Sequence, residues 1–264
     1  MKKLSISIII CFAFFIAFSH EYILLAEKYR LQKGEELQLH LFVADGFNIE
    51  VERPFQKTPT KSFELITTDG VIDLSATADG TLPIVRREVD FDGGGLIHLE
   101  RDYARITLAT PKFLDYLKED NIENIPAKVD RKKAEQKERY TRYIKLLVQS
   151  GKQMNDTVYK TITGQKFEIV LLQNPYNLVT GKTLKAKILF DGQPLKNKVI
   201  TARSRTGNEA ALALTSRTNA QGICSFILSR KGEWFIHATH MIECPDKTDS
   251  DWESFWTSYS FEIE

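Results

Sequence analysis

The segment ELQLHLFVA, residues 36–44, decides the fold class because its leucine and valine residues recur at every second position. A period of two is the pattern of a β-strand that buries one face. Outward from this segment, turn sequences such as Asp69-Gly70 and Asp79-Gly80 separate further short runs of this kind. Such closely spaced short strands are typical of a β-sandwich. The strands predicted in this part are 36–44, 61–68, 82–89, 95–101 and 104–109.

The same pattern returns after residue 160. Seven short strands in roughly a hundred residues are typical of an immunoglobulin-like or transthyretin-like sandwich. We expect two of them, 222–229 and 233–241, to form a hairpin around Lys231-Gly232. The seven predicted strands are 166–173, 183–190, 198–203, 211–215, 222–229, 233–241 and 255–263.

Between these two parts the apolar period changes. Pro111 stands where a helix could begin, and apolar residues follow it at helical spacing. Residues 130–149 carry many charges and an apolar stripe, so we predict a charged helix there as well. The sequence therefore predicts a mainly β protein with two β-sandwich domains joined by a helical segment. The N-terminal sandwich spans 20–110, the helical segment 111–150, and the C-terminal immunoglobulin-like sandwich 160–264.

Residues 1–19 have the three-part pattern of a secretory signal peptide. A positive start, Met1-Lys2-Lys3, precedes an apolar run at 4–18, and Ala17-Phe18-Ser19 supplies small residues for cleavage. The alternative is an uncleaved membrane anchor, but the run is short for a span of about twenty residues. We expect cleavage before His20 and a secreted or periplasmic product without a stable transmembrane anchor.

The charge balance narrows the function classes. The chain has 264 residues, with 36 Lys and Arg against 35 Asp and Glu, and a formal charge of +1. Loss of residues 1–19 removes two lysines and no acidic residue, which changes this charge to −1. A near-neutral chain is not a polybasic nucleic-acid binder, so no nucleic-acid partner is expected.

Cleavage before His20 would create a chelating terminus. His20 would then carry a free α-amine beside its imidazole, and both nitrogens could bind one metal ion. Cu(II) and Ni(II) favour such nitrogen donors. A third donor from a distant side chain would complete a histidine brace. The alternative is that His20 is an ordinary terminal residue.

Six short stretches, spread over nearly the whole mature chain, form a recognisable set. They are His20-Glu21-Tyr22, Arg139-Tyr140-Thr141-Arg142-Tyr143 with Lys145, Asn174-Pro175-Tyr176, residues 189–195, Thr239-His240-Met241 and residues 251–256. In this order they resemble a NikM-like, nickel-uptake-associated family of secreted bacterial domains of unknown function. The resemblance implies a periplasmic two-part β protein connected with transition-metal handling, and it implies no established reaction.

His240 is the expected partner of His20 in a metal site. His237 and His240 are three positions apart in one predicted strand, so their side chains should point to opposite faces. His240 falls in a stretch that carries the resemblance and leads into an acidic region. We predict a metal site formed by His20 and His240, to which Glu21 or Glu243 adds an oxygen donor.

The two cysteines of the mature chain should not form a disulfide. In the predicted hairpin, Cys224 lies opposite Thr239 or His240, and Cys244 is further along by roughly 13–17 Å at the rise of a strand. A disulfide needs Cα atoms within about 7 Å. Unless the second strand bends back, we expect Cys224 to be a buried apolar residue.

Trp252 and Trp256 are expected to form a packing cluster with Phe255, and the alternative is an exposed platform on which a sugar could stack. No nucleophile elbow, P-loop, dinucleotide glycine pattern, paired-cysteine zinc motif or HExxH sequence is present. We therefore expect a non-enzymatic periplasmic accessory protein that binds nickel, cobalt or copper and acts with an envelope metal transporter. Two alternatives stay open, a structural or ligand-binding envelope module with a carbohydrate or protein partner, and a copper oxygenase.

Overall fold

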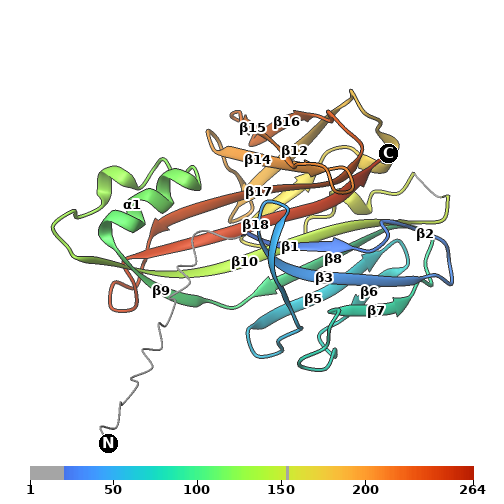
Figure 1. Ribbon diagram of the computed structural model, residues 1–264, viewed down its shortest axis with the longest axis horizontal. Helices are drawn as coiled ribbons and strands as arrows, with labels where there is room; N and C mark the ends of the chain where they lie inside the picture. The colour runs from blue at the N-terminus through green and yellow to red at the C-terminus, as the bar shows by residue number, and fades with distance from the viewer. Residues whose placement is uncertain (1–20, 153–154) are drawn as a thin grey trace, which may run out of the picture.

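The computed structural model describes residues 21–152 and 155–264, and within them all the strands belong to three β-sheets (Figure 1). The first sheet consists of β1 (Glu21–Ala26), β3 (Glu36–Asp45), β4 (Asn48–Arg53) and β7 (Val85–Glu88). The third consists of β11 (Phe167–Leu171), β12 (Thr183–Phe190), β13 (Gln193–Pro194) and β16 (Ile223–Ile227). The mainly β prediction is confirmed.

The second sheet has ten strands and runs through the middle of the molecule (Figure 1). Its main path is β15 (Leu212–Arg217), β14 (Val199–Arg205), β17 (Gly232–Glu243), β18 (Trp252–Ile263), β10 (Glu135–Ser150), β8 (Gly93–Arg101), β5 (Thr60–Thr67) and β6 (Gly70–Asp73). Two further strands, β2 (Arg30–Leu31) and β9 (Ala104–Ala109), pair with β10. Strands from before residue 110 and after residue 160 thus belong to one sheet.

The apolar core is also continuous between these parts. One cluster of buried side chains includes Leu39 of β3, Leu65 of β5, Ile188 of β12 and Ile236 of β17. The long strands β10 and β18 join the two halves, because they pair in parallel from Glu138 opposite Trp252 onward. The division into separate domains near residues 110 and 160 stays a prediction.

The helix predicted at 130–149 is wrong, since residues 135–150 form the strand β10. Every residue from Tyr143 to Ser150 is buried, because this end of β10 lies inside the molecule. A strand covered on both faces has a continuous apolar run rather than an alternating one, and such a run can be mistaken for a helical stripe. The helix that Pro111 signals is present as α1 (Thr110–Glu119), which buries Phe113, Tyr116 and Leu117.

The expected hairpin at 222–241 is also wrong, because β16 pairs with β12 whereas β17 lies between β14 and β18. Gly232 has φ +106°, and a Cβ there would lie 2.3 Å from the carbonyl oxygen of Arg205. This glycine therefore allows β17 to start close against β14 and does not close a turn back to β16. Cys224 and Cys244 are both buried and free. Cys224 is thus buried as expected, although the hairpin from which its position was argued does not form.

No helix in the described part of the chain is long and apolar enough to cross a membrane. The predicted signal peptide, residues 1–19, and His20 lie outside the described residues.

Candidate functional site

A cavity of about 550 Å³ lies where β1 begins, bordered by β14, β17 and the end of α1. Four carboxylates line it, from Glu21, Asp45, Glu119 and Asp120. The other ionisable side chains in its lining are those of Arg203 and His237. With a neutral imidazole, four negative charges against one positive charge make this an acidic cavity.

The packing of β1 on β17 explains why Glu21 and His237 meet. Ile23 and Leu25 point to the same side of β1 as Glu21, and both pack in one buried cluster with Phe235 of β17. His237 follows Phe235 by two residues and therefore points to the same face of β17. The apolar contact thus brings the carboxylate of Glu21 to the imidazole of His237, with 3.4 Å between Oε1 and Nε2.

Neighbouring groups hold the Glu21 carboxylate in place. Its Oε2 accepts a hydrogen bond of 3.0 Å from the backbone N–H of Gly46. The Arg203 guanidinium lies 3.6 Å from Oε1 and also 3.7 Å from Asp45. Glu21 itself is only 6% exposed, so the start of β1 is fixed inside the protein.

His237 has the properties of an available ligand. Its side chain is 12% exposed, and Nε2 is buried without a hydrogen-bond partner among residues 21–152 and 155–264. Burial lowers the pKa of His237, and the nearby Glu21 opposes this effect only in part. The ring is therefore neutral at pH 7, and a neutral imidazole is the form that binds metal ions.

His240 lies on the other face of β17, away from Glu21. Its ring centroid is 4.5 Å from that of Phe190 and 5.9 Å from that of Phe167. Burial lowers the pKa of His240 to about 4. The predicted opposite orientation of the two histidines is confirmed, but the structure brings Glu21 to His237 rather than to His240.

Glu243 lies at the end of β17 in a surface ion-pair cluster. Its carboxylate is 3.2 Å from Lys128 Nζ and 3.4 Å from Lys247 Nζ. Hydrogen bonds from these two lysines lower the pKa of Glu243. Glu243 is not among the residues that line the acidic cavity around Glu21.

The two tryptophans pack beneath α1. Trp252 is 4% exposed, stacks on Phe113 at 5.8 Å and donates a hydrogen bond of 2.9 Å from Nε1 to Gln136. An exposed sugar platform at Trp252 is therefore wrong, because α1 covers this ring. Trp256 is half-buried and stacks on Tyr116 at 6.0 Å.

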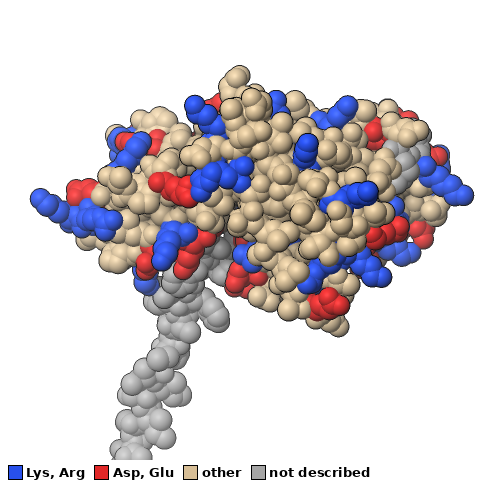
Figure 2. Space-filling view, turned by 90° about the horizontal axis from the view of Figure 1, so that it is seen from above, with Lys and Arg blue, Asp and Glu red and all other residues tan. Residues whose placement is uncertain are grey.

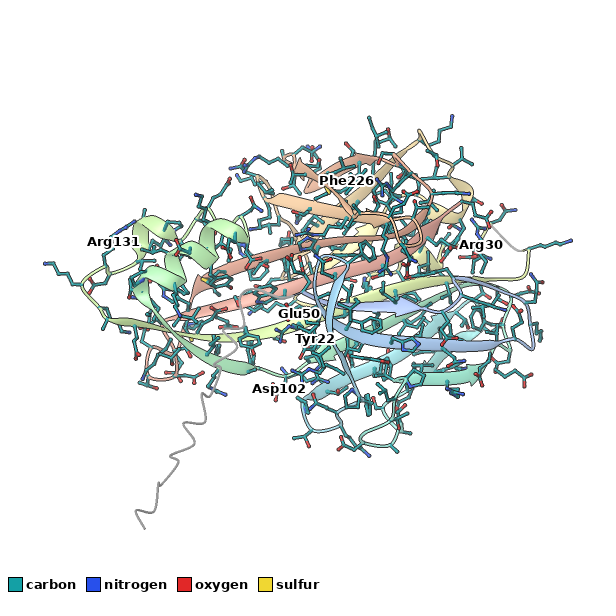
Figure 3. All side chains as sticks on the ribbon, in the orientation of Figure 1. Tyr22, Arg30, Glu50, Asp102, Arg131 and Phe226 are labelled. Atoms are coloured by element: carbon teal, nitrogen blue, oxygen red, sulfur yellow. The ribbon has the colours of Figure 1, made fainter. Side chains whose placement is uncertain are left out.

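Arg142 lies among aromatic rings beside Trp256. Its guanidinium is 4.0 Å from the ring centroid of Tyr22, labelled in Figure 3, and 4.6 Å from that of Tyr140. The hydroxyl of Ser258 donates to the carbonyl oxygen of Tyr22 at 2.8 Å. These contacts hold β1 over β10 and β18, which further fixes the position of Glu21.

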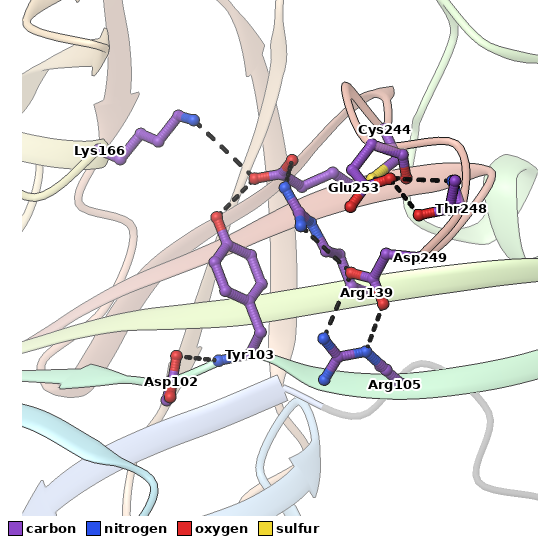
Figure 4. Close-up of polar contacts among 10 residues, drawn as sticks. Asp102, Tyr103, Arg105, Arg139, Lys166, Cys244, Thr248, Asp249 and Glu253 are labelled. Carbon is purple, nitrogen blue, oxygen red and sulfur yellow. Dashed lines mark hydrogen bonds and ion pairs between the residues drawn. The ribbon is translucent and has the colours of Figure 1, made fainter.

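A polar network joins the parallel pair β10 and β18 to β9 (Figure 4). Glu253, 1% exposed, accepts hydrogen bonds of 2.5 Å from Tyr103 and 2.6 Å from Arg139. Arg139 and Arg105 both donate to Asp249. Burial and the bond to Glu253 raise the pKa of Tyr103. Two of the stretches that carry the family resemblance, 139–143 and 251–256, are thus neighbours that maintain the sheet.

On the face shown in Figure 2, acidic and basic side chains lie close to one another among uncharged residues. In the part of the chain that the structure describes, no group of three or more His, Cys, Asp or Glu side chains is arranged to hold a metal ion. To hold a metal ion, Glu21 and His237 would need at least one further donor atom. His20 is the residue next to Glu21 in the sequence.

Comparison with known proteins gives a family without an assigned activity. No curated protein matches the sequence. Among solved structures, the D0-D1 domain of Intimin is similar with a TM-score of 0.23 and 10% identity, covering 91% of this chain and 96% of that one. A tetra-tandem repeat in the extending region of a large adhesion protein has a TM-score of 0.26 and 9% identity, covering 93% of this chain and 50% of that one.

The family profile described as "Domain of unknown function (DUF4198)" matches residues 17–242. The expectation of an uncharacterised family is confirmed, and its connection with nickel uptake stays a prediction. The chain belongs to the DUF4198 family of domains of unknown function.

Proposed function

We propose that the protein, exported and cleaved before His20, binds a divalent nickel, cobalt or copper ion as an accessory protein of an envelope metal transporter. The supporting observation is the buried Nε2 of His237, which has no hydrogen-bond partner among the described residues and faces Glu21 at 3.4 Å. His237 thus replaces His240 as the proposed partner of His20.

Chain geometry supports a common site for His20 and His237. Consecutive Cα atoms are about 3.8 Å apart, so a cleaved terminus would begin one residue from the fixed carboxylate of Glu21. The α-amine and imidazole of His20 with the imidazole of His237 would supply three nitrogen donors, and Glu21 would add an oxygen. Such nitrogen-rich sets suit Cu(II) and Ni(II).

The surroundings favour a cation. The cavity carries four carboxylates against the single charge of Arg203, and such a field concentrates cations. The Gly46 N–H and Arg203 both contact the Glu21 carboxylate, in the manner of groups that orient a metal ligand. A bound divalent ion would also compensate the repulsion among these carboxylates.

The test is a metal titration of the processed protein by competition with a chromogenic chelator. His237→Gln should weaken Ni(II) and Cu(II) binding by at least about tenfold, which corresponds to about 1.4 kcal/mol. An extra alanine before His20 should abolish tight binding, because it separates the α-amine from the imidazole. The matched control, His240→Gln, should stay within about twofold of the wild type.

Two results would overturn the proposal. One is equal affinity of the His237→Gln variant and the wild type, with both shown to be folded. The other is a mature terminus that does not begin at His20. Reductant-dependent peroxide production by the copper-loaded protein would point instead to the oxygenase alternative.

A further inference from the structure

A second cavity, of about 280 Å³, lies on the His240 face of β17. It is bordered by the turn that follows α1 and by the loop that leads from β13 to β14. Neither Glu21 nor His237 lines it. Its lining consists of Asn121, Glu123, Asn124, Leu195, Lys196, Asn197, Lys198 and His240.

Lys198 is a buried cation near two carboxylates, those of Asp120 and Glu123, which oppose the effect of burial on its pKa. The residue is 7% exposed and donates one hydrogen bond of 2.8 Å from Nζ to the carbonyl oxygen of Asn121. Of these two carboxylates, Glu123 is itself bound by both terminal nitrogens of Arg217 at 2.6 and 2.8 Å. Burial lowers the pKa of Lys198 to about 8, so the amine is still mostly charged at pH 7.

His240 supplies a neutral polar group to the same cavity. Its Nδ1 is buried and has no hydrogen-bond partner in the described part of the chain. Because its pKa is about 4, the ring stays neutral near pH 7 and carries a single N–H. A buried charge and a buried unpaired nitrogen are each unfavourable, and one ligand could satisfy both.

We propose that this cavity is a binding site for a small monocarboxylate, whose oxygens accept hydrogen bonds from Lys198 and from the ring of His240. The lining carries two lysines, Lys196 and Lys198, against the one carboxylate of Glu123, so a single negative charge balances it and a doubly charged phosphate would be less well compensated. The volume of 280 Å³ suffices for such an ion, since one water needs only about 10–15 Å³. Leu195 gives the cavity an apolar wall against which a short carbon chain can lie.

A purely structural role for Lys198 makes a different prediction. Its bond to Asn121 satisfies a carbonyl just after the end of α1, where a cation is favourable. In that case Lys198→Gln would change stability, and acetate would have no effect on the ring of His240. The two roles therefore differ in whether acetate changes the NMR signals of the His240 ring.

The experiment follows the ring resonances of His240 by NMR in the whole metal-free protein while acetate replaces chloride at constant ionic strength. We expect a saturable shift, weakened by at least about tenfold in Lys198→Gln. Lys185→Gln, an exposed lysine of β12, is the matched control and should stay within about twofold. Calorimetry on His240→Gln, which retains Lys198, should show acetate binding at least about threefold weaker and covers the case in which Lys198→Gln does not fold.

Binding should also weaken as the pH rises above about 8, because Lys198 then loses its proton. The charged and titratable groups around Lys198 are Asp120, Glu123, Lys196, Arg217 and His240. His237→Gln should leave acetate binding unchanged, which separates this site from the proposed metal site. A shift that does not saturate, or equal acetate affinity in Lys198→Gln, would show an adventitious ion only and overturn the proposal.

Discussion

The two faces of β17 place the same type of side chain in opposite chemical settings. His237 faces β1 and the acidic cavity, where its Nε2 lies 3.4 Å from Glu21. His240, three residues later, lies among the rings of Phe190 and Phe167 with Lys198 as its charged neighbour. Carboxylates thus surround one histidine and a lysine neighbours the other, because residues from other parts of the chain set the chemical environment of each ring.

The largest effect should come from Phe235→Ala, which removes the ring that packs β1 on β17. Phe235 is fully buried and its centroid lies 5.0 Å from that of Phe47. We expect a loss of about 3–5 kcal/mol in the free energy of unfolding, measured by urea denaturation. Metal binding should fall with it, because Glu21 loses its fixed position. Acetate binding on the other face should persist in the folded variant, and its parallel loss would remove the distinction between the faces.

A smaller effect should appear in the pH dependence of stability. Burial lowers the pKa of His240 to about 4, so below the ordinary value of about 6.5 the unfolded chain takes up a proton that the folded protein does not. Stability that is present above about pH 6.5 is therefore lost as the pH falls toward about 4. The loss should be about 2 kcal/mol near pH 5, and His240→Gln should remove it.

Urea midpoints of the metal-free protein, collected at intervals from neutral to acid pH, measure this difference. His237→Gln is the matched comparison on the opposite face. Its effect has the same sign, because burial lowers the pKa of His237 too, but the Coulombic effect of Glu21 opposes it. A His240→Gln variant with unchanged acid sensitivity would contradict the assigned environment of His240.

The smallest effects should separate the two acidic residues expected at the metal. Glu21→Gln should weaken Ni(II) binding by about threefold to tenfold, because it removes an oxygen donor next to His237. Glu243→Gln should leave the affinity within about twofold, since Glu243 is held by Lys128 and Lys247 at the surface. The same chelator competition measures both variants. A stronger effect at Glu243 than at Glu21 would reverse the assignment.

Local patterns predicted the parts of the fold that depend on one buried face. The alternation at 36–44 corresponds to β3, and Pro111 marks the start of α1. The prediction failed at 135–150, because β10 is covered on both faces and its run of apolar residues has no period of two. The prediction failed again at Gly232, where a hairpin turn was expected. Glycine is needed there because a Cβ would collide with the carbonyl oxygen of Arg205, and the sequence does not reveal this contact.

The candidate site shows the same limit. The sequence placed His237 and His240 on opposite faces, which the contacts of each ring confirm. It named Glu21 but did not connect it with His237, since that contact depends on how β1 packs across the sheet. The sequence did contain a usable signal. Phe235 and His237 are two residues apart on β17, as Glu21 and Ile23 are on β1, so packing of the two apolar residues brings the two polar ones together. Packing between sheets is a long-range property that strand periodicity does not encode.

The most direct test of the metal assignment counts the imidazoles bound to Cu(II) by pulsed electron paramagnetic resonance of the processed protein. The proposal predicts two coordinated imidazoles in the wild type, two in His240→Gln and one in His237→Gln. Two imidazoles in His237→Gln with one in His240→Gln would contradict it, and so would a copper spectrum that neither substitution changes.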